Sequence, residues 1–490
     1  MLLYAFFTDA QSSFLDLSFG NDGLIILPAK TAATSGSTTS IAVQPDGKII
    51  AGGGIGYTCA IRFKTDGSLD SSFADNGIYV APDNSTINAL TLQPDGKILI
   101  AGSILNTSDL ATDFLTLRLN ADGSLDKSFG NSGLAITKFS TSNDIGYAIA
   151  LQTDGKILVA GNSSGTYAGI ARLNINGSPD STFGLYGLVN GTWGPEVCAV
   201  AISSDGKILS GSNSFDFSFM ATRLLSNGML DTSFNHTGMV KTLIGDTYDY
   251  CHAMQVQPDS KIILGGSATF GTLGTDFTTI RYKANGSIDS SFGANGVAHI
   301  DFNNGDDDIR TMCLAKDGSI FLGGESVASS NQDFALSKLS STGSIDKSFC
   351  NAGKITTDIQ GSTDFAAAIA IQSDEKILLG GSSERNDHSG ISDFTLTRYI
   401  NTSLYVTDVN HSISGSILYP NPNRGFIHIN PKYSDQILSI KAVSSTGKPV
   451  KIEYDFNQRE VLLKNAPMDV YYFTIQLKNG SSIIEKILKR

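Results

Sequence analysis

Short apolar runs alternate with polar turns along the 490-residue chain, without the 3.6-residue period of an amphipathic helix. Runs such as Leu24–Leu27, Lys48–Gly53 and Cys59–Lys64 are bounded by Asp, Asn and Gly, which predicts β-strands. The Asp46-Gly47 pair predicts a tight hairpin, because both residue types tolerate positive φ. The run at Lys48–Gly53 does not alternate, as expected of a strand covered on both faces. The pattern predicts an all-β protein.

Three sequence boxes return seven times in a fixed order, and the phenylalanines of the first box recur at intervals of 51 to 58 residues. The first, Leu/Ile-Asp-x-Ser-Phe or a close variant, is the Phe box, and its phenylalanines are Phe19, Phe73, Phe129, Phe183, Phe234, Phe292 and Phe349. The second, a turn followed by Lys-Ile, starts at Gln44, Gln93, Gln152, Ser203, Gln257, Ala315 and Gln372. The third is an apolar strand with one cation: Arg62, Arg118, Arg172, Arg223, Arg281, Lys338 or Arg398. Such a repeat predicts a solenoid or a propeller.

Each unit contains four expected strands, which in the first unit are Leu24–Leu27, Thr39–Gln44, Lys48–Gly53 and Cys59–Lys64. Four short strands in about 55 residues match a propeller blade better than the shorter coil of a β-helix. We therefore expect a seven-bladed β-propeller of four-stranded blades. Because Leu15–Leu27 is in phase with every later unit, a strand from the N-terminus is a candidate to complete the final blade.

The three boxes resemble the bacterial delta-60 repeat over Leu15–Ser403. That family is thought to form β-propellers of extracellular proteins, so the resemblance implies an architecture and a compartment but no chemistry. The sequence departs from the repeat at Ser260 and Glu375, which replace a turn glycine, and at Pro179 and Lys338.

Charge divides the chain near residue 404. The formal net charge is −12, of which the segment Leu404–Arg490 carries +4 and the remainder −16. An acidic body repels phosphate backbones, so we expect no nucleic-acid partner. Five widely spaced cysteines without a C-x-x-C pair predict neither a zinc site nor a disulfide framework.

The tail lacks the repeat and alternates apolar strands with Asn-Gly, Thr-Gly and Pro turns, which predicts a small Ig-like β-sandwich. It resembles the type A C-terminal sorting domain of the bacterial type IX secretion system (T9SS), although Asp469-Val470 stands where that family has a glycine before a tyrosine. The resemblance implies that the secretion machinery is a partner of the tail. The residues that match the sorting signal are Tyr419, Pro420, Asn421, Pro422, Gly425, Lys486, Lys489 and Arg490.

The expected organisation has four parts. Residues 1–14 form an apolar lead-in with the character of a signal-peptide remnant, 15–403 the propeller, 404–414 a linker and 415–490 the sorting sandwich. No apolar run approaches the ~20 residues of a membrane helix, so no transmembrane span is expected. The expected location is extracellular or at the outer-membrane surface, reached through the periplasm.

No catalytic residue, metal ligand set or cofactor is predicted. Structural calcium at the Phe-box aspartates is an open alternative, but each unit offers only one carboxylate there, whereas calcium needs several converging oxygens. The simpler interpretation is that each aspartate caps its own loop. The Phe-box aspartates are Asp16, Asp70, Asp126, Asp180, Asp231, Asp289 and Asp346.

Loops that differ from unit to unit are expected to share one face of the disc, where binding residues concentrate on a rigid scaffold. Their candidate ligand-binding residues are Tyr147, Trp193, Tyr248, Tyr250, Asp306, Asp307, Asp308 and Phe365. The favoured hypothesis is a secreted or cell-surface, non-catalytic protein that binds a glycan or a protein. The alternatives are a secreted polysaccharide- or ester-cleaving enzyme, since fold does not decide function, and a spacer that displays the sorting tail.

Overall fold

The computed structural model describes residues 14–30, 35–271, 274–302, 304–328, 331–387, 389–401, 418–419, 426–431, 433, 436–444, 449–455, 459–463, 469–478 and 482–489. Two compact units divide between Asn401 and Thr402. In the described residues the regular elements of both units are β-strands, and the five cysteines are free thiols.

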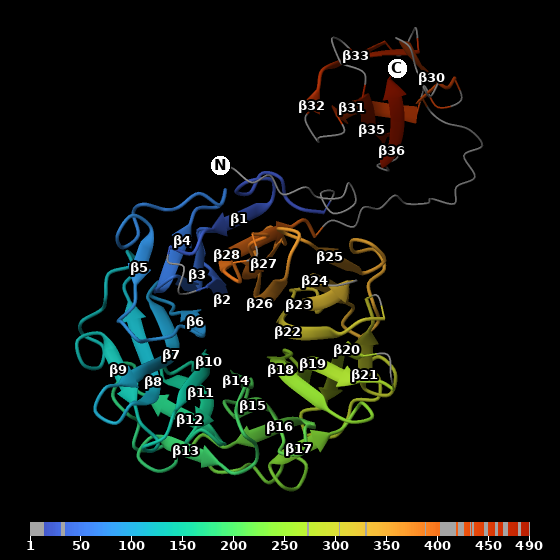
Figure 1. The fold of residues 1–490 in the computed structure, drawn as a ribbon. Helices are drawn as coiled ribbons and strands as arrows, with labels where there is room; N and C mark the ends of the chain where they lie inside the picture. The colour runs from blue at the N-terminus through green and yellow to red at the C-terminus, as the bar shows by residue number, and fades with distance from the viewer. Residues whose placement is uncertain are drawn as a thin grey trace. The chain divides into compact units, whose positions relative to one another are not determined.

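The first unit contains seven four-stranded antiparallel sheets arranged as a ring, which confirms the predicted propeller (Figure 1). Blade 1 consists of β2 (Gly36–Val43), β3 (Ile49–Ile55), β4 (Thr58–Phe63) and β5 (Ile78–Val80). Blade 2 consists of β6 (Ala89–Leu92), β7 (Ile98–Asn106), β8 (Ala111–Leu119) and β9 (Leu134–Thr137). Blade 3 consists of β10 (Ile145–Leu151), β11 (Ile157–Ser163), β12 (Tyr167–Leu173) and β13 (Leu188–Gly191). Blade 4 consists of β14 (Ala199–Ile202), β15 (Ile208–Asn213), β16 (Phe219–Leu224) and β17 (Met239–Thr242).

The remaining blades keep the same strand order, with the innermost strand first. Blade 5 consists of β18 (Asp249–Val256), β19 (Ile262–Thr269), β20 (Thr275–Tyr282) and β21 (Val297–Ile300). Blade 6 consists of β22 (Asp307–Leu314), β23 (Ile320–Ala328), β24 (Asn331–Leu339) and β25 (Lys354–Thr357). Blade 7 consists of β26 (Asp364–Ile371), β27 (Ile377–Glu384), β28 (Ser392–Tyr399) and, from the N-terminus, β1 (Leu24–Leu27).

The sequence unit and the blade are offset by one strand. The first strand after each Phe box becomes the outermost strand of the preceding blade, so the four strands of one sequence unit do not form one sheet. In blade 7 this strand is β1, which pairs antiparallel with β28 from Leu24↔Thr397 to Leu27↔Phe394. The N-terminal segment therefore closes the ring, because it satisfies the outer edge of the last blade.

The hydrophobic core lies between neighbouring blades. Ile50 and Ala60 of blade 1, for example, pack with Leu90 and Ile98 of blade 2 in one buried cluster. The second and third strands of each blade have apolar runs without alternation, because both faces of a blade are covered by its neighbours.

The Phe box and the strand-three cation form one buried contact. In blade 2, Nε of Arg118 lies 2.7 Å from Oδ2 of Asp126, its guanidinium lies 4.6 Å from the ring centre of Phe129, and Lys97 Nζ also contacts Asp126 at 2.7 Å. Nη1 of Arg118 donates to the carbonyl of Ile175 in the next blade at 2.6 Å. The hydrogen bond from Lys97 leads the effects that hold the pKa of Asp126 well below its usual range. The box thus links adjacent blades.

The second unit contains two four-stranded sheets around a core that includes Ile427, Val461, Phe473 and Ile487. One sheet consists of β29 (Leu418–Tyr419), β30 (Phe426–Ile429), β34 (Glu460–Leu463) and β33 (Ile452–Asp455). The other consists of β32 (Pro449–Val450), β31 (Ile437–Ser444), β35 (Asp469–Leu477) and β36 (Ser482–Lys489). This pair of sheets agrees with the predicted sandwich.

Candidate functional site

The innermost strands of the seven blades surround the centre of the ring (Figure 1). Because the strands of each blade are antiparallel, the loops between blades and the loops between second and third strands emerge on the same side. We call this side the variable-loop face. The Asp-Gly turns and Phe boxes emerge on the opposite side, which we call the repeating face.

Five innermost strands carry a β-bulge at the same place, next to the variable-loop face. A bulge leaves one residue unpaired and re-aims its side chain. This residue differs from blade to blade, and in blades 5 and 6 it is a histidine and an arginine. The bulged residues are Thr39, Tyr147, His252, Arg310 and Ala367.

The bulge residues His252 and Arg310 belong to one charged network between blades 5 and 6. Arg310 donates to Oε1 of Glu325 at 2.8 Å, and its Nη2 lies 3.1 Å from Oδ2 of Asp308. Nε2 of His252 lies 3.1 Å from Nη1 of Arg310 and 3.3 Å from Oδ2 of Asp308. The Glu325 side chain is only 2% exposed, and burial raises its pKa to about 7. The guanidinium of Arg310 therefore contacts two carboxylates and an imidazole.

A cluster of aromatic rings continues this network toward the variable-loop face. The ring of Phe217 lies 5.1 Å from Tyr248 and 5.8 Å from Tyr250, with near-perpendicular geometry toward Tyr248. Tyr250 stacks on His252 at 6.4 Å with only 8° between the ring planes. These phenylalanine and tyrosine residues are 39% to 54% exposed. We call Phe217, Tyr248 and Tyr250 the aromatic cluster.

Three of the predicted ligand-binding residues, Tyr248, Tyr250 and Asp308, therefore lie in one site. The sequence reasoning did not select Phe217, His252, Arg310 or Glu325. Of these four residues, only Glu325 could have been recognised from the sequence, because it interrupts the apolar second strand of its blade. The equivalent residue in blades 2, 5 and 7 is serine: Ser103, Ser267 and Ser382.

The other predicted residues lie elsewhere. Trp193 lines a separate groove of about 650 Å³ with Phe215, Met220 and Lys241. Phe365 is exposed on β26, two residues before the bulge of blade 7, and so occupies the place that Tyr250 has in blade 5.

Three more predicted residues differ in their exposure: Asp306 is exposed, Tyr147 is half-buried and Asp307 is buried. Tyr147 is half-buried on β10, which raises the pKa of its hydroxyl. Oδ1 of Asp306 accepts a hydrogen bond from the amide of Thr275 at 3.0 Å. Asp307 is fully buried at the start of β22, and its Oδ2 accepts from the amide of Phe302 at 2.7 Å, so it holds the backbone that follows β21.

The sorting-signal residues are only partly within the described structure. Tyr419 belongs to β29, and Lys486 and Lys489 belong to β36. Pro420, Asn421, Pro422, Gly425 and Arg490 lie outside the described residues.

The Phe-box aspartates, which were the candidates for calcium, are engaged by cations of the protein. Arginine or lysine nitrogens contact each of them, as Lys48 and Arg62 contact Asp70 at 3.1 and 2.8 Å. Their second oxygen accepts from the loop, as Oδ1 of Asp70 does from the hydroxyl of Ser72 at 2.7 Å. These contacts agree with the loop-capping interpretation.

Comparison with protein families identifies both parts of the chain. Residues 44–73, 93–129, 152–183, 257–292 and 301–349 match "Domain of unknown function (DUF5122) beta-propeller". Residues 417–490 match "Secretion system C-terminal sorting domain". The chain therefore carries delta-60-type propeller repeats and a T9SS sorting domain, which indicates engagement of the secretion machinery and export to the cell surface or the extracellular space. Within the described ranges, no helix has the length and apolar character needed to cross a membrane.

No curated protein matches the sequence. Solved structures with similar folds include a catalytically inactive virginiamycin B lyase from Staphylococcus aureus with quinupristin, at 12% identity and a TM-score of 0.38, covering 76% of this chain and 98% of that one. Sqt1 from Chaetomium thermophilum bound to the N-terminus of ribosomal protein L10 is 11% identical, with a TM-score of 0.39 and coverage of 75% and 98%. A fungal alcohol oxidase of the AA5 family in complex with copper is 12% identical, with a TM-score of 0.33 and coverage of 82% and 96%. These similarities carry no functional argument.

Proposed function

We propose that this secreted or cell-surface protein binds a carbohydrate on its variable-loop face without cleaving it. The observation that supports the proposal is the aromatic cluster of Phe217, Tyr248 and Tyr250 beside the charged network of Asp308 and Arg310. Exposed rings offer apolar faces on which a sugar can stack, while a few fixed polar groups hydrogen-bond its hydroxyls.

The location of the cluster also supports a binding role. It lies on loops and innermost strands of blades 4 and 5, where a rigid ring holds side chains that do not repeat around the molecule. Aromatic side chains have few rotatable bonds, so a ligand that orders them loses little conformational entropy. The Phe-box residues repeat in nearly every blade and serve the fold instead.

The experiment is a glycan-array screen of the purified full-length chain, followed by calorimetry with any hit. Tyr248→Ala and Tyr250→Ala are expected to weaken binding at least tenfold. Phe365→Ala is the matched control, because Phe365 has the same position in blade 7, and Tyr186→Ala, 77% exposed near a Phe box, controls for aromatic loss on the repeating face. Equal effects of all four substitutions would contradict the proposal. If the chain binds a surface protein and no glycan, the ligand is a protein and the carbohydrate proposal is wrong.

The charged network supports a second candidate, a secreted polysaccharide- or ester-cleaving enzyme. Glu325 is buried beside His252 and Asp308, and its pKa of about 7 suits a proton donor or acceptor near neutral pH. Arg310 already contacts both carboxylates, which favours a positioning role over proton transfer. Turnover of a polysaccharide or ester substrate that Glu325→Gln abolishes would replace the binding proposal with this one.

A further inference from the structure

Two clusters of three aspartates occupy equivalent places at consecutive blade junctions. Between blades 5 and 6 the cluster is Asp276 on β20, Asp301 directly after β21 and Asp307 at the start of β22. Between blades 6 and 7 the equivalent residues are Asp333 on β24, Asp358 directly after β25 and Asp364 at the start of β26. In each cluster one oxygen from every carboxylate lies within 4.8 Å of the other two.

Each cluster contains a buried carboxylate oxygen that lacks a cationic partner in the described chain. Asp307 and Asp364 are 0% exposed, and Oδ2 of each accepts from a backbone amide, that of Phe302 at 2.7 Å or Ile359 at 2.8 Å. Among the described residues their Oδ1 atoms meet no cation and form no well-aligned hydrogen bond, and the side chains that stabilise the two carboxylates are the uncharged hydroxyls of Ser326 and Ser383. An unpaired buried carboxylate is costly unless it is protonated or meets a cation.

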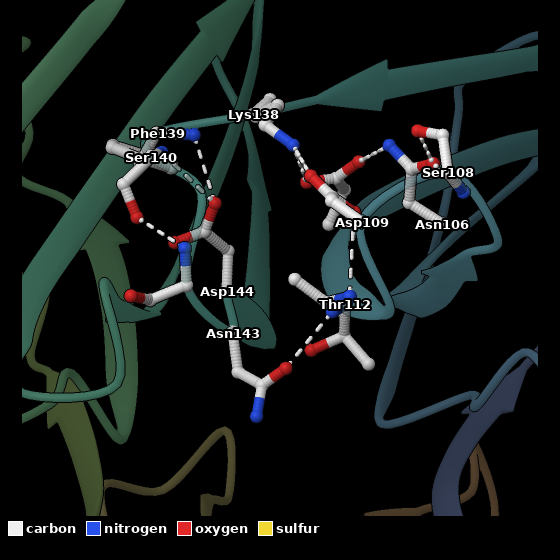
Figure 2. Close-up of polar contacts among 12 residues, drawn as sticks. Asn106, Ser108, Asp109, Thr112, Lys138, Phe139, Ser140, Asn143 and Asp144 are labelled. Carbon is white, nitrogen blue, oxygen red and sulfur yellow. Dashed lines mark hydrogen bonds and ion pairs between the residues drawn. The ribbon is translucent and has the colours of Figure 1, made fainter.

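The junction between blades 2 and 3 shows how a cation can neutralise the carboxylates at this place in the fold. Asp113 and Asp144 correspond to the first and third aspartates of the clusters. Lys138 occupies the second position, directly after β9, and Figure 2 shows it beside Asp109. Nζ of Lys138 bonds the carboxylate of Asp109 and lies 3.8 Å from Oδ1 of Asp113. Here the chain places its own cation among the carboxylates.

At the two aspartate clusters the corresponding residue adds a negative charge instead. Within the described ranges, none of the six carboxylates forms an ion pair with a side chain of the protein. Lys354 lies near the first cluster, but its ammonium donates to the backbone carbonyls of Asp301 and Phe302. Near the second cluster, Asn331 donates only one long hydrogen bond, 3.4 Å, to Asp333. Three carboxylates therefore converge at each described junction without an ion pair, and at the first cluster His299 and Lys354 act on Asp276 only through space.

We propose that each aspartate cluster binds one calcium ion, which links the third and outermost strands of one blade to the innermost strand of the next. Calcium takes six to eight oxygen ligands at about 2.3–2.6 Å, so two ligands of one ion lie at most about 5 Å apart. The separation of the carboxylate oxygens satisfies this limit. Magnesium fits less well, because it demands near-octahedral geometry and gives up its water reluctantly.

The test uses the full-length chain, stripped with EDTA and then titrated with CaCl₂ by calorimetry, with metal content measured after dialysis. Two ions are expected for the unmodified chain, one for Asp301→Asn, one for Asp358→Asn and none for the double variant. Asparagine keeps the size and the oxygen acceptor that caps the loop amides of Asn304 and Gly361, and circular dichroism verifies that each variant is folded. Asp109→Asn, at the junction that holds Lys138, is the matched control and is expected to leave two ions.

Thermal unfolding provides a second measurement. Calcium is expected to raise the midpoint, since it binds the folded chain, and magnesium at the same concentration is expected to raise it much less. Asp358→Lys imitates the junction of blades 2 and 3, so it is expected to bind one ion fewer without lowering the midpoint in EDTA. The proposal is overturned if the unmodified chain binds no calcium at ~5 mM, which exceeds the dissociation constants of extracellular modules. It is also overturned if the substitutions leave the number of ions unchanged.

Discussion

The guanidinium of Arg398 lies 4.2 Å from the ring centre of Phe19, a residue nearly the whole propeller away in sequence. The same guanidinium contacts Asp16 at 2.8 Å and donates to the carbonyl of Thr65 in blade 1 at 2.6 Å. This arrangement matches the contacts of Arg118 within the ring. The point where the two ends of the ring meet therefore has the same chemistry as the interior blade contacts that use arginine, whereas blade 6 uses Lys338.

Loss of Asp16 is expected to destabilise the ring as much as loss of an interior Phe-box aspartate. Asp16→Ala leaves Arg398 buried without its carboxylate, which costs about 3–5 kcal/mol. Urea unfolding followed by tryptophan and tyrosine fluorescence measures the change in free energy. Asp126→Ala is the matched interior variant, and Leu17→Ala, on an exposed neighbour, is the control. A cost for Asp126→Ala without one for Asp16→Ala would show that the N-terminal strand does not hold the ring closed.

Two hairpin turns are expected to gain stability from glycine. Ser260 and Glu375 adopt φ of 63° and 67° where the other units have glycine, such as Gly155 at 83°. A side chain in this left-handed region costs roughly 1–2 kcal/mol, so Ser260→Gly and Glu375→Gly are each expected to raise the free energy of unfolding by about 1 kcal/mol. The reciprocal change, Gly155→Ser, is expected to lower it. Chemical denaturation measures all three, and a destabilising Ser260→Gly would refute the argument.

Acid is expected to destabilise the propeller through the Phe boxes. Hydrogen bonds from Lys97, Ser128 and Arg118, in that order of effect, hold the pKa of Asp126 well below its usual range, so the unfolded chain binds protons at a higher pH than the folded chain does. The stabilisation is therefore complete above about pH 5 and is lost as pH falls toward the folded pKa. Unfolding midpoints between pH 6 and pH 2.5 measure this effect. Asp126→Asn is expected to have a shallower acid slope, and an unchanged slope would contradict the assignment.

Deletion of the tail is expected to stop export after the inner membrane. Without residues 417–490, which match the sorting domain, the propeller has no signal for the outer-membrane step and should accumulate in the periplasm of a bacterium with this secretion system. Fractionation and immunoblotting of cells expressing either form locate the protein. Equal amounts of truncated and full-length protein outside the cell would show that the tail is dispensable.

The sequence predicted the number of blades because three boxes mark every unit, and each box has one physical task. The Asp-Gly pairs form hairpins, and the Phe box pairs with the cation of strand three, as Asp126 does with Arg118. The offset between unit and blade was harder to foresee, since hydrophobic pattern identifies strands but does not say which neighbours they pair with. The strand Leu24–Leu27 belongs to the first sequence unit, but in the structure it pairs with β28 and so completes blade 7.

The site was less predictable, because its residues come from different units. Phe217 of blade 4 packs against Tyr250 of blade 5, and His252 of blade 5 contacts Arg310 of blade 6. The spacing between such residues in sequence reflects the size of the repeat and nothing about their chemistry. The aspartate clusters have the same origin, since Asp276 and Asp307 lie on different blades.

The one-strand offset between unit and blade has a consequence for how such rings change size. Every boundary between units falls inside a sheet, so a gene segment that gains or loses one whole unit still encodes complementary strand edges at its new junctions. The Phe box of one unit pairs with the cation of the unit before it, as Asp126 does with Arg118. An inserted unit therefore brings both halves of this contact, and each half meets an equivalent partner at the new junctions. Duplication can therefore enlarge the ring in whole steps without inventing a new interface.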